Sequence, residues 1–149
     1  MVVTMDAKPV RVGQEEASTN VSNAKSVLHI STQNEGAVLF LTLQGELDLH
    51  TVDELRRVIG EGIANPHCTD IVADMQGVSF VDSSGYGTFL NAMQSLRPRS
   101  GRVHLAGCVP AVVRMLAIVR LNRVFQIHDT MDEARAAVAG LLTASAPAA

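Results

Sequence analysis

Two spacings of apolar residues alternate along this chain, and together they predict an α/β domain. Two apolar, β-branched runs come first, over residues 26–32 and 37–44, and the intervening Gln33-Asn34-Glu35-Gly36 has the composition of a turn. From Thr51 onwards, segments with apolar residues at helical spacing alternate with short apolar runs. The pattern therefore predicts an N-terminal β-hairpin followed by repeated helix and strand units.

Start signals and periodicity place these later elements individually. We expect strands over 71–75, 103–106 and 124–127. Capping-box spacing predicts helix starts at Thr51, with Glu54, and at Thr130, with Glu133. Pro110 suits the first position of a third helix. Its predicted buried stripe comprises Val112, Val113, Leu116 and Val119.

The element order β-β-α-β-α-β-α-β-α predicts one domain with a mostly parallel, mixed β-sheet, a leading hairpin and about four helices. We expect this domain to span residues 26–142. Residues 1–25 are polar and lack periodicity, which predicts a flexible N-terminal tail, and residues 143–149 form a tail of small residues.

Composition narrows the class of protein. Aromatic residues make up 3% of the 149 residues and there is no Trp, so the core is expected to be aliphatic and to offer no platform for stacking bases. No run of about 18 apolar residues is present, and two distant cysteines form neither a disulfide framework nor a metal cluster. We expect a cytoplasmic protein with free thiols that uses no cofactor or metal and binds neither nucleic acid nor membrane.

The net charge of −3 is small, but the charges are unevenly distributed. Residues 97–123 contain six arginines and no acidic residue. A strip of one charge can mark a docking surface, although a solvated helix face plus a basic loop is the more common origin of this pattern.

Candidate chemistry concentrates in VSFVDSSGYG, residues 78–87, where a predicted strand passes into a helix. A nucleophile elbow needs glycines two residues before and two after the serine. Ser83 is followed by Gly85 but preceded by Val81, and Ser84 has neither glycine. The glycines also match neither a Walker loop nor a dinucleotide fingerprint. A hydrolase or a nucleotide-binding site is therefore poorly supported.

A charge switch is the third possibility for this stretch. Phosphorylation of a serine at a helix start adds about −1.5 to −2 charges, which the helix dipole and free amides tolerate but a docked partner would not. The competing interpretation is that Asp82 and Ser83 are ordinary helix caps, with Gly85 and Gly87 easing a tight entry. Position alone leaves both interpretations open.

Several motifs together resemble the STAS domain of bacterial anti-sigma-factor antagonists. They are GELD at 45–48, VSFVDSSG at 78–85, the strand with Gly101, Val103 and Leu105, the later LxxVFxI at 121–127, and Glu133-Ala134. The resemblance implies a binding protein rather than an enzyme. In this family the unphosphorylated antagonist binds an anti-sigma factor that is also a serine kinase, so that a sigma factor is released to direct transcription. The kinase inactivates the antagonist by phosphorylation, and a serine phosphatase restores it.

Carried over by motif, the resemblance implies that Ser83 is the phosphorylation site and Ser84 a secondary one. The resemblance also implies that Asp48 lies at the same sheet edge as Ser83. Where the family most often has Leu, this chain has Tyr86, which is expected on an exposed turn, where it alters partner choice or simply packs. Alternative functions are a STAS subunit of a stress-signalling or transport complex without phosphorylation and, less well supported, a small serine hydrolase. The implied partner-binding surface comprises Asp48, Asp82, Ser83, Ser84, Gly85 and Tyr86.

Overall fold

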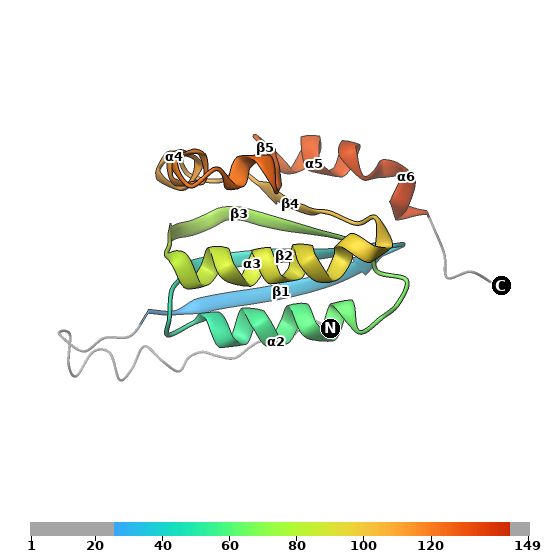
Figure 1. Ribbon diagram of the computed structural model, residues 1–149, viewed down its shortest axis with the longest axis horizontal. Coiled ribbons are helices and arrows are strands. Elements are labelled where there is room, and N and C mark those ends of the chain that lie inside the picture. Colours follow the sequence, from blue (N-terminus) through green and yellow to red (C-terminus); the bar gives the residue numbers. More distant parts are fainter. Residues whose placement is uncertain (1–25, 144–149) are drawn as a thin grey trace.

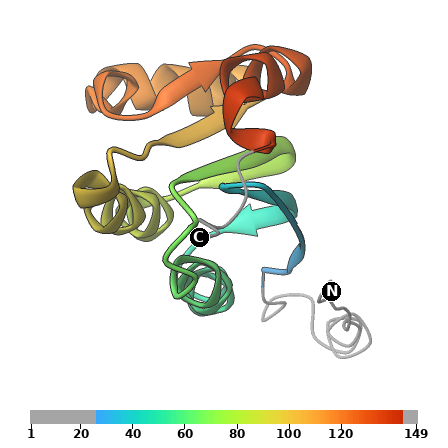
Figure 2. The same ribbon diagram turned by 90° about the vertical axis from the view of Figure 1, so that its right-hand side faces the viewer.

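A computed structural model describes residues 26–143, which form one five-stranded sheet with helices on both faces (Figures 1 and 2). The sheet order is β1-β2-β3-β4-β5; β1 runs antiparallel to β2, and the other neighbours are parallel. This confirms the predicted mixed sheet with a leading hairpin. Both predicted tails lie outside the described residues, apart from Thr143. The strands are β1 (Leu28–Glu35), β2 (Val38–Leu47), β3 (Asp70–Val81), β4 (Val103–Ala106) and β5 (Gln126–His128).

The hairpin turn is tighter than its composition predicted. Glu35 pairs with Val38, so the turn consists of Gly36 and Ala37 alone, and Gln33 to Glu35 extend β1. Gly36 has a φ of +58°, and a Cβ atom there would lie 2.2 Å from the carbonyl oxygen of Leu141. Glycine is therefore required by both conformation and space at this turn.

The helices are α2 (Val52–Ile63), α3 (Ser83–Leu96), α4 (Pro110–Ile118), α5 (Met131–Ala137) and α6 (Ala139–Leu142), with short 3₁₀ segments η3 (Arg97–Arg99) and η4 (Leu121–Arg123). Within residues 26–143 there are thus five α-helices instead of about four. The predicted last helix divides at Val138. This break lets the Leu141 carbonyl accept a hydrogen bond from the Ala37 amide at 3.0 Å, next to the hairpin turn. Pro110 occupies the predicted first position of α4.

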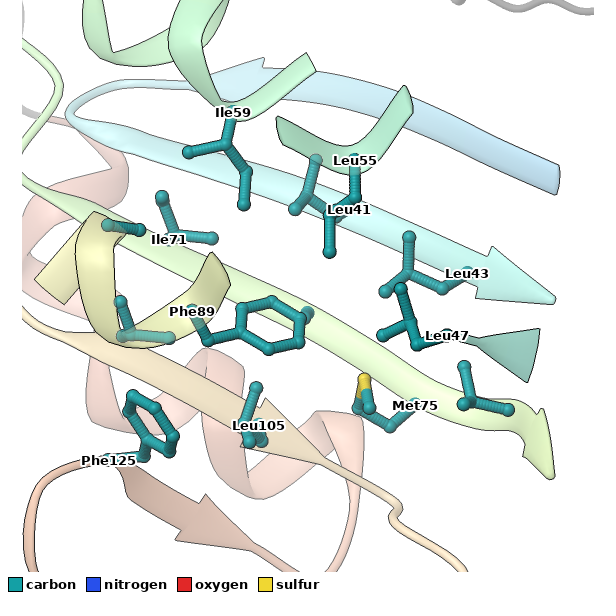
Figure 3. Close-up of a cluster of buried hydrophobic side chains, with 14 of the residues drawn as sticks. Leu41, Leu43, Leu47, Leu55, Ile59, Ile71, Met75, Phe89, Leu105 and Phe125 are labelled. Carbon is teal, nitrogen blue, oxygen red and sulfur yellow. The ribbon is translucent and has the colours of Figure 1, made fainter. Parts of the chain in front are cut away.

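Helices α2, α3 and α4 cover one face of the sheet and enclose the larger core (Figure 3). This core is mainly aliphatic, as predicted, with Phe89 and Phe125 packed edge to face at a centroid distance of 6.3 Å. The predicted stripe of α4 is only half right. Val112 and Leu116 are buried, whereas Val113 and Val119 are 43% and 47% exposed. Only Val112 and Leu116, which are four residues apart and so lie on the same side of the short α4, face the sheet.

The opposite face carries α5 and a smaller apolar cluster (Figure 2). Arg135 of α5 pairs with Glu35 of β1 at 2.8 Å and lies 4.5 Å from the Phe40 ring centroid, so it fastens α5 across the hairpin. None of the helices in the described part of the chain has the length and apolarity needed to cross a bilayer. The cluster comprises Val38, Phe40, Val72, Ala106, Ala134 and Val138.

Candidate functional site at the start of helix α3

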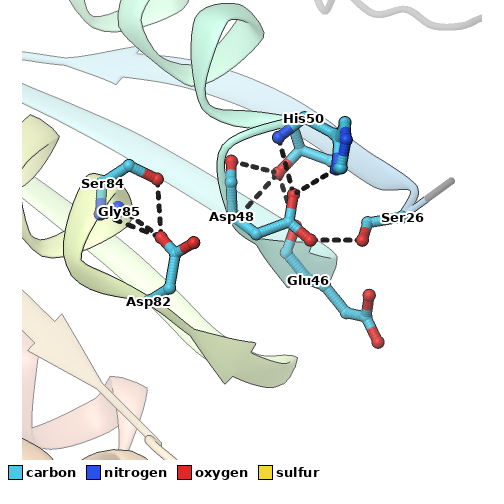
Figure 4. A network of polar contacts seen from close by, with 8 residues as sticks. Ser26, Glu46, Asp48, His50, Asp82, Ser84 and Gly85 are labelled. Atoms are coloured by element: carbon cyan, nitrogen blue, oxygen red, sulfur yellow. Dashed lines mark hydrogen bonds and ion pairs between the residues drawn. The ribbon is translucent and has the colours of Figure 1, made fainter.

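Strands β2 and β3 end side by side, and the loops that follow them meet at one edge of the sheet (Figure 4). Leu47 is paired with Val81, and the backbone N–H of Asp82 donates to the Leu47 carbonyl at 2.9 Å. Asp48 comes directly after β2, and Asp82 directly after β3. Asp48 and Ser83 therefore lie at the same edge of the sheet, as the resemblance implied.

Asp82 caps helix α3 with its side chain. Its Oδ1 accepts hydrogen bonds from the backbone N–H groups of Ser84 and Gly85, at 2.9 and 3.3 Å, and from the Ser84 hydroxyl at 2.6 Å. These bonds satisfy amides that have no partner inside the helix. Asp82 is thus the N-cap residue of α3, and the helix itself begins at the first serine, Ser83.

These contacts also set the ionisation of Asp82. The pKa of this carboxyl lies below its usual value, first because the Ser84 hydroxyl donates to the charged form. Partial burial acts in the opposite direction, and the backbone N–H groups of Gly85, Ser84 and Leu49 lower the pKa further. Asp82 is accordingly a fixed negative charge at the surface at neutral pH.

The two serines differ in availability. The Ser84 side chain is half-buried and tied to Asp82, whereas Ser83 is exposed and its hydroxyl makes no hydrogen bond within residues 26–143. Ser83 is also the first residue of α3. The Ser83 oxygen is therefore accessible from solvent without the loss of a hydrogen bond within the described residues.

Gly85 and Tyr86 are buried, which corrects the expected exposure of Tyr86. A Cβ atom on Gly85 would lie 2.8 Å from Val81 Cγ1 and 3.1 Å from Leu47 Cβ, so this glycine lets α3 approach the strand ends. Tyr86 is 8% exposed, and its hydroxyl is buried with no hydrogen-bond partner in the described chain. Desolvation raises the pKa of this phenol. Of the two expected roles of Tyr86, the structure favours packing. Gly87 has no such steric role, because a Cβ there would meet nothing within 4 Å.

Asp48 organises the loop that precedes α2. Its carboxylate accepts from the backbone N–H of His50 at 2.9 Å and from the Ser26 hydroxyl. The Thr51 hydroxyl accepts from the Asp48 N–H at 3.1 Å and donates to the Glu46 carbonyl at 2.7 Å.

The predicted capping box at Thr51 is therefore wrong. The Thr51 side chain makes no bond to the amides of α2, because the Glu46 carbonyl and the Asp48 amide engage it instead. Glu54 pairs with Arg57 on the helix surface. At Thr130 the prediction is half right: its hydroxyl accepts from the Glu133 N–H, but the Glu133 carboxylate accepts from Asp129 rather than from Thr130.

Two exposed apolar residues adjoin the site residues in the sequence and were not predicted. Leu49 is 73% exposed in the loop after Asp48, and Phe80 is 51% exposed near the end of β3. The exposure of Leu49 could have been predicted, because it is a large apolar residue inside a polar turn. The exposure of Phe80 could not, because the alternation of residues in a strand does not reveal which face of the sheet lacks a covering helix.

Cys68 and Cys108 are free, and burial raises the pKa of both thiols, that of Cys108 to about 11. Neither thiol therefore has the thiolate character that a redox switch needs. No group of three or more metal-ligating side chains with the spacing of a metal site occurs between residues 26 and 143.

Comparison with known proteins identifies the family. The family model of the STAS domain matches residues 29–134, and the chain belongs to this family. The anti-sigma F factor antagonist of Paenibacillus polymyxa is 32% identical over 102 residues, which cover 68% of this chain and 87% of that protein.

Solved structures agree with this assignment. The anti-sigma factor antagonist SpoIIAA in its unphosphorylated form is 28% identical, with a TM-score of 0.62 over 74% of this chain and 98% of SpoIIAA. The Bacillus cell fate determinant SpoIIAA in its phosphorylated form is also 28% identical, with a TM-score of 0.60 over 73% and 98% of the two chains. The fold seen here is thus one that is known both with and without phosphate.

Proposed function

We propose that this chain is an anti-sigma-factor antagonist: it binds an anti-sigma factor with serine kinase activity, releases a sigma factor, and is switched off by phosphorylation of Ser83. The proposal includes a serine phosphatase that removes the phosphate and action in the cytoplasm. It assigns the chain no catalytic activity of its own. The named relatives and the SpoIIAA structures support the antagonist role.

The observation that carries the proposal is the contrast between the two serines. Ser83 is exposed and without a hydrogen bond in the described residues, whereas the Ser84 hydroxyl already donates to Asp82 at 2.6 Å. Transfer of the γ-phosphoryl group of ATP to Ser83 forms an O–P bond and releases the hydroxyl proton and ADP. No contact of the cap must break for this step. The same step at Ser84 would remove a donor from Asp82.

The cap also determines where the added charge acts. Helix amides were expected to be free to receive a phosphate, but the Asp82 carboxylate already occupies those of Ser84 and Gly85. A phosphate on Ser83 would therefore stand in solvent beside Asp82, with about −1.5 to −2 additional charges. The domain keeps its fold because this position is exposed. A partner that docks there meets concentrated negative charge.

The docking surface in this proposal joins the two loops. Leu49, which follows Asp48, and Phe80, two residues before Asp82, supply exposed apolar area on the segments that carry the two carboxylates. Apolar side chains beside a few charged groups are typical of the centre of a protein–protein interface. Gly85 and Tyr86 support this surface from below rather than contacting the partner directly, since both are buried.

The alternative functions have less support. A serine hydrolase needs a histidine that accepts the proton of the nucleophile, and in residues 26–143 no histidine bonds to Ser83. A STAS subunit of a stress-signalling or transport complex would use the same surface without phosphorylation. It is distinguished from the proposed antagonist by experiment.

The first test is phosphorylation. The full chain is incubated with candidate anti-sigma kinases and ATP, and phosphate is mapped by mass spectrometry in the wild type and in Ser83→Ala and Ser84→Ala variants. We expect phosphate on Ser83 in the wild type and in Ser84→Ala, and none in Ser83→Ala. Phosphate on neither serine with any kinase would favour the unphosphorylated complex subunit.

The second test measures binding to the anti-sigma factor. Ser83→Asp should weaken binding by about 10- to 100-fold, since like charges at an interface cost several kcal/mol. Ser83→Ala, the matched control, should bind as the wild type does but should not respond to kinase and ATP. Calorimetric titration checks both. Equal affinities of the two variants would show that charge at Ser83 does not control docking.

A further inference from the structure

Three titratable side chains, far apart in the sequence, form a hydrogen-bonded chain across three strands. Asp70, the first residue of β3, accepts from His104 of β4, with 2.8 Å between Oδ2 and Nε2. The other ring nitrogen of His104, Nδ1, lies 3.1 Å from Nε2 of His128, the last residue of β5. Asp70 and His104 are only 5% and 3% exposed. The proposed antagonist function uses none of these groups.

The two imidazoles meet edge to edge. Their ring centroids are 5.3 Å apart with an interplanar angle of 18°. The centroid distance is close to the 3.1 Å N···N distance plus the two ring radii, so both nitrogens lie on the line between the ring centres. Because the interplanar angle is small, the two rings are nearly coplanar. The arrangement is that of a straight N–H···N hydrogen bond, not of stacked rings.

The direction of each bond follows from the carboxylate. Ionised Asp70 only accepts, and it also receives the Thr69 hydroxyl at 2.8 Å. His104 must therefore donate from Nε2, which leaves Nδ1 of a neutral His104 as an acceptor. His128 then donates from Nε2 to His104. Every donor in the chain points inward, towards Asp70.

These hydrogen bonds stabilise the short strand β5. Strand β5 has three residues and pairs with β4 only through His104–Gln126, Leu105–Ile127 and Ala106–His128. It begins directly after Phe125, which packs against Phe89 of α3, and it leads into α5. A bond between β4 and β5 side chains thus fastens an edge strand and the helix that follows it.

The hydrogen bond between His104 and His128 depends on pH, because it requires that at most one of the two facing nitrogens carries a proton. One added proton is accommodated on Nδ1 of His128, because Nε2 still donates to His104. A second proton places hydrogen on both facing nitrogens and a positive charge on both rings, so the His104–His128 bond must break.

Burial and neighbouring charges shift the pKa of His128. Burial and the charge of His104 lower the pKa of His128 from its usual 6.5, and Glu133 of α5 acts in the opposite direction. Arg135 of α5 is paired with Glu35 of β1. Because the unfolded chain then binds the His128 proton more readily than the folded chain, stability from this residue is complete above about 6.5 and decreases below it.

We propose that Asp70, His104 and His128 form a proton-dependent latch: it fastens β5 and α5 while the histidines share at most one added proton and releases them when both are protonated. This device is independent of phosphorylation at Ser83. Release would loosen the segment that seats Phe125 against α3, while α2 stays folded.

Hydrogen exchange of the full chain tests the latch. Exchange is followed by mass spectrometry at about pH 7.5 and about pH 5 and corrected for intrinsic rates. We expect peptides covering β5 and α5 to lose several-fold more protection than peptides covering α2. Equal losses in both regions would overturn the proposal.

His128→Gln is the informative variant. The Gln side-chain amide keeps a donor for His104 Nδ1 but takes up no proton, so the extra acid-induced loss of protection should disappear. His29→Gln, which changes an exposed histidine of β1, is the matched control and should behave as the wild type does. An unchanged acid response in His128→Gln would contradict the latch.

An NMR titration of the wild type keeps the proposal testable if that variant fails to fold. The ring nitrogen signals report the tautomer and charge of each histidine. Near neutral pH we expect the proton between the two rings on Nε2 of His128 and none on Nδ1 of His104, and we expect His128 to bind its added proton below the usual pKa of 6.5. A proton on Nδ1 of His104 near neutral pH would overturn the latch.

Discussion

Helices α2 and α3 begin at the same edge of the sheet, but their first turns differ in chemistry. The first turn of α2 carries Asp53 and Glu54, and its first residue, Val52, is buried. The first turn of α3 has no acidic residue, and its first residue is the exposed Ser83. In α2 the negative charges that stabilise a helix N-terminus belong to the helix itself. In α3 the carboxylate of Asp82, the residue before the helix, stabilises the N-terminus instead.

The fourth residues of the two helices show a second difference. Leu55 of α2 and Tyr86 of α3 are both buried against the strands. Leu55 has no polar atom to satisfy, whereas the Tyr86 hydroxyl is buried without a partner in the described residues. The start of α2 is thus optimised for stability. The start of α3 leaves Ser83 exposed and buries an unpaired hydroxyl below it, which costs stability.

The largest expected effect on stability comes from removing the cap of α3. Asp82→Ala should lower the free energy of unfolding by about 1–2 kcal/mol, because the Ser84 amide loses its acceptor and the Gly85 amide keeps only the Asp82 carbonyl. Urea denaturation near neutral pH measures this. Asp82→Asn, which keeps an acceptor oxygen, should lose less. Equal losses would show that charge matters more than the hydrogen bonds.

The same cap predicts an acid dependence. Since the pKa of Asp82 in the folded chain lies below its usual 3.8, its stabilisation is present above that value and is lost as the pH falls through the folded pKa. The stability difference between the wild type and Asp82→Ala should therefore shrink in acid. A constant difference down to about pH 2 would contradict this linkage.

The buried hydroxyl predicts a gain of stability. Tyr86→Phe should raise the free energy of unfolding by about 1 kcal/mol, because it removes an unpaired polar atom without changing the shape of the ring. Thermal and urea unfolding measure the change. Tyr86→Leu is the contrasting variant and should lower stability, since it leaves unfilled volume. A loss in Tyr86→Phe would mean that the hydroxyl has a partner.

The smallest expected effect separates the two serines. Ser84→Ala should cost about 0.5–1.5 kcal/mol, because Asp82 loses its hydroxyl donor. The same variant should raise the pKa of Asp82, measured by NMR of the carboxyl carbon, since this donor is the main cause of the lowered pKa. Ser83→Ala is the control and should stay within about 0.5 kcal/mol of the wild type. Equal effects would remove the distinction between a tied and an available serine.

Local patterns in the sequence were enough to predict much of the fold. The element order, the hairpin, the aliphatic core and the helix starting at Pro110 follow from spacing and from residue preferences that act over a few positions. The placement of Asp48 and Ser83 at one edge of the sheet followed from the resemblance of their motifs to the STAS family. Ser83 was ranked first from its motif alone.

Other features of the site depend on contacts between segments distant in the sequence. Thr51 has the spacing of a capping box, yet the Glu46 carbonyl and the Asp48 amide engage its hydroxyl. Tyr86 lies in a polar, glycine-rich stretch, yet α3 approaches the strands so closely at Gly85 that its ring is buried.

The sequence by itself determined the order of the helices and strands and that a serine follows a capping aspartate in the stretch 78–87. Only the tertiary structure decided which serine hydroxyl is available, that Tyr86 is buried, and that Asp70, His104 and His128 join in one hydrogen-bonded chain. The physical reason is the range of the interactions. Helix caps and apolar periodicity act over a few residues, whereas burial and side-chain hydrogen bonds between strands exist only after the sheet has assembled.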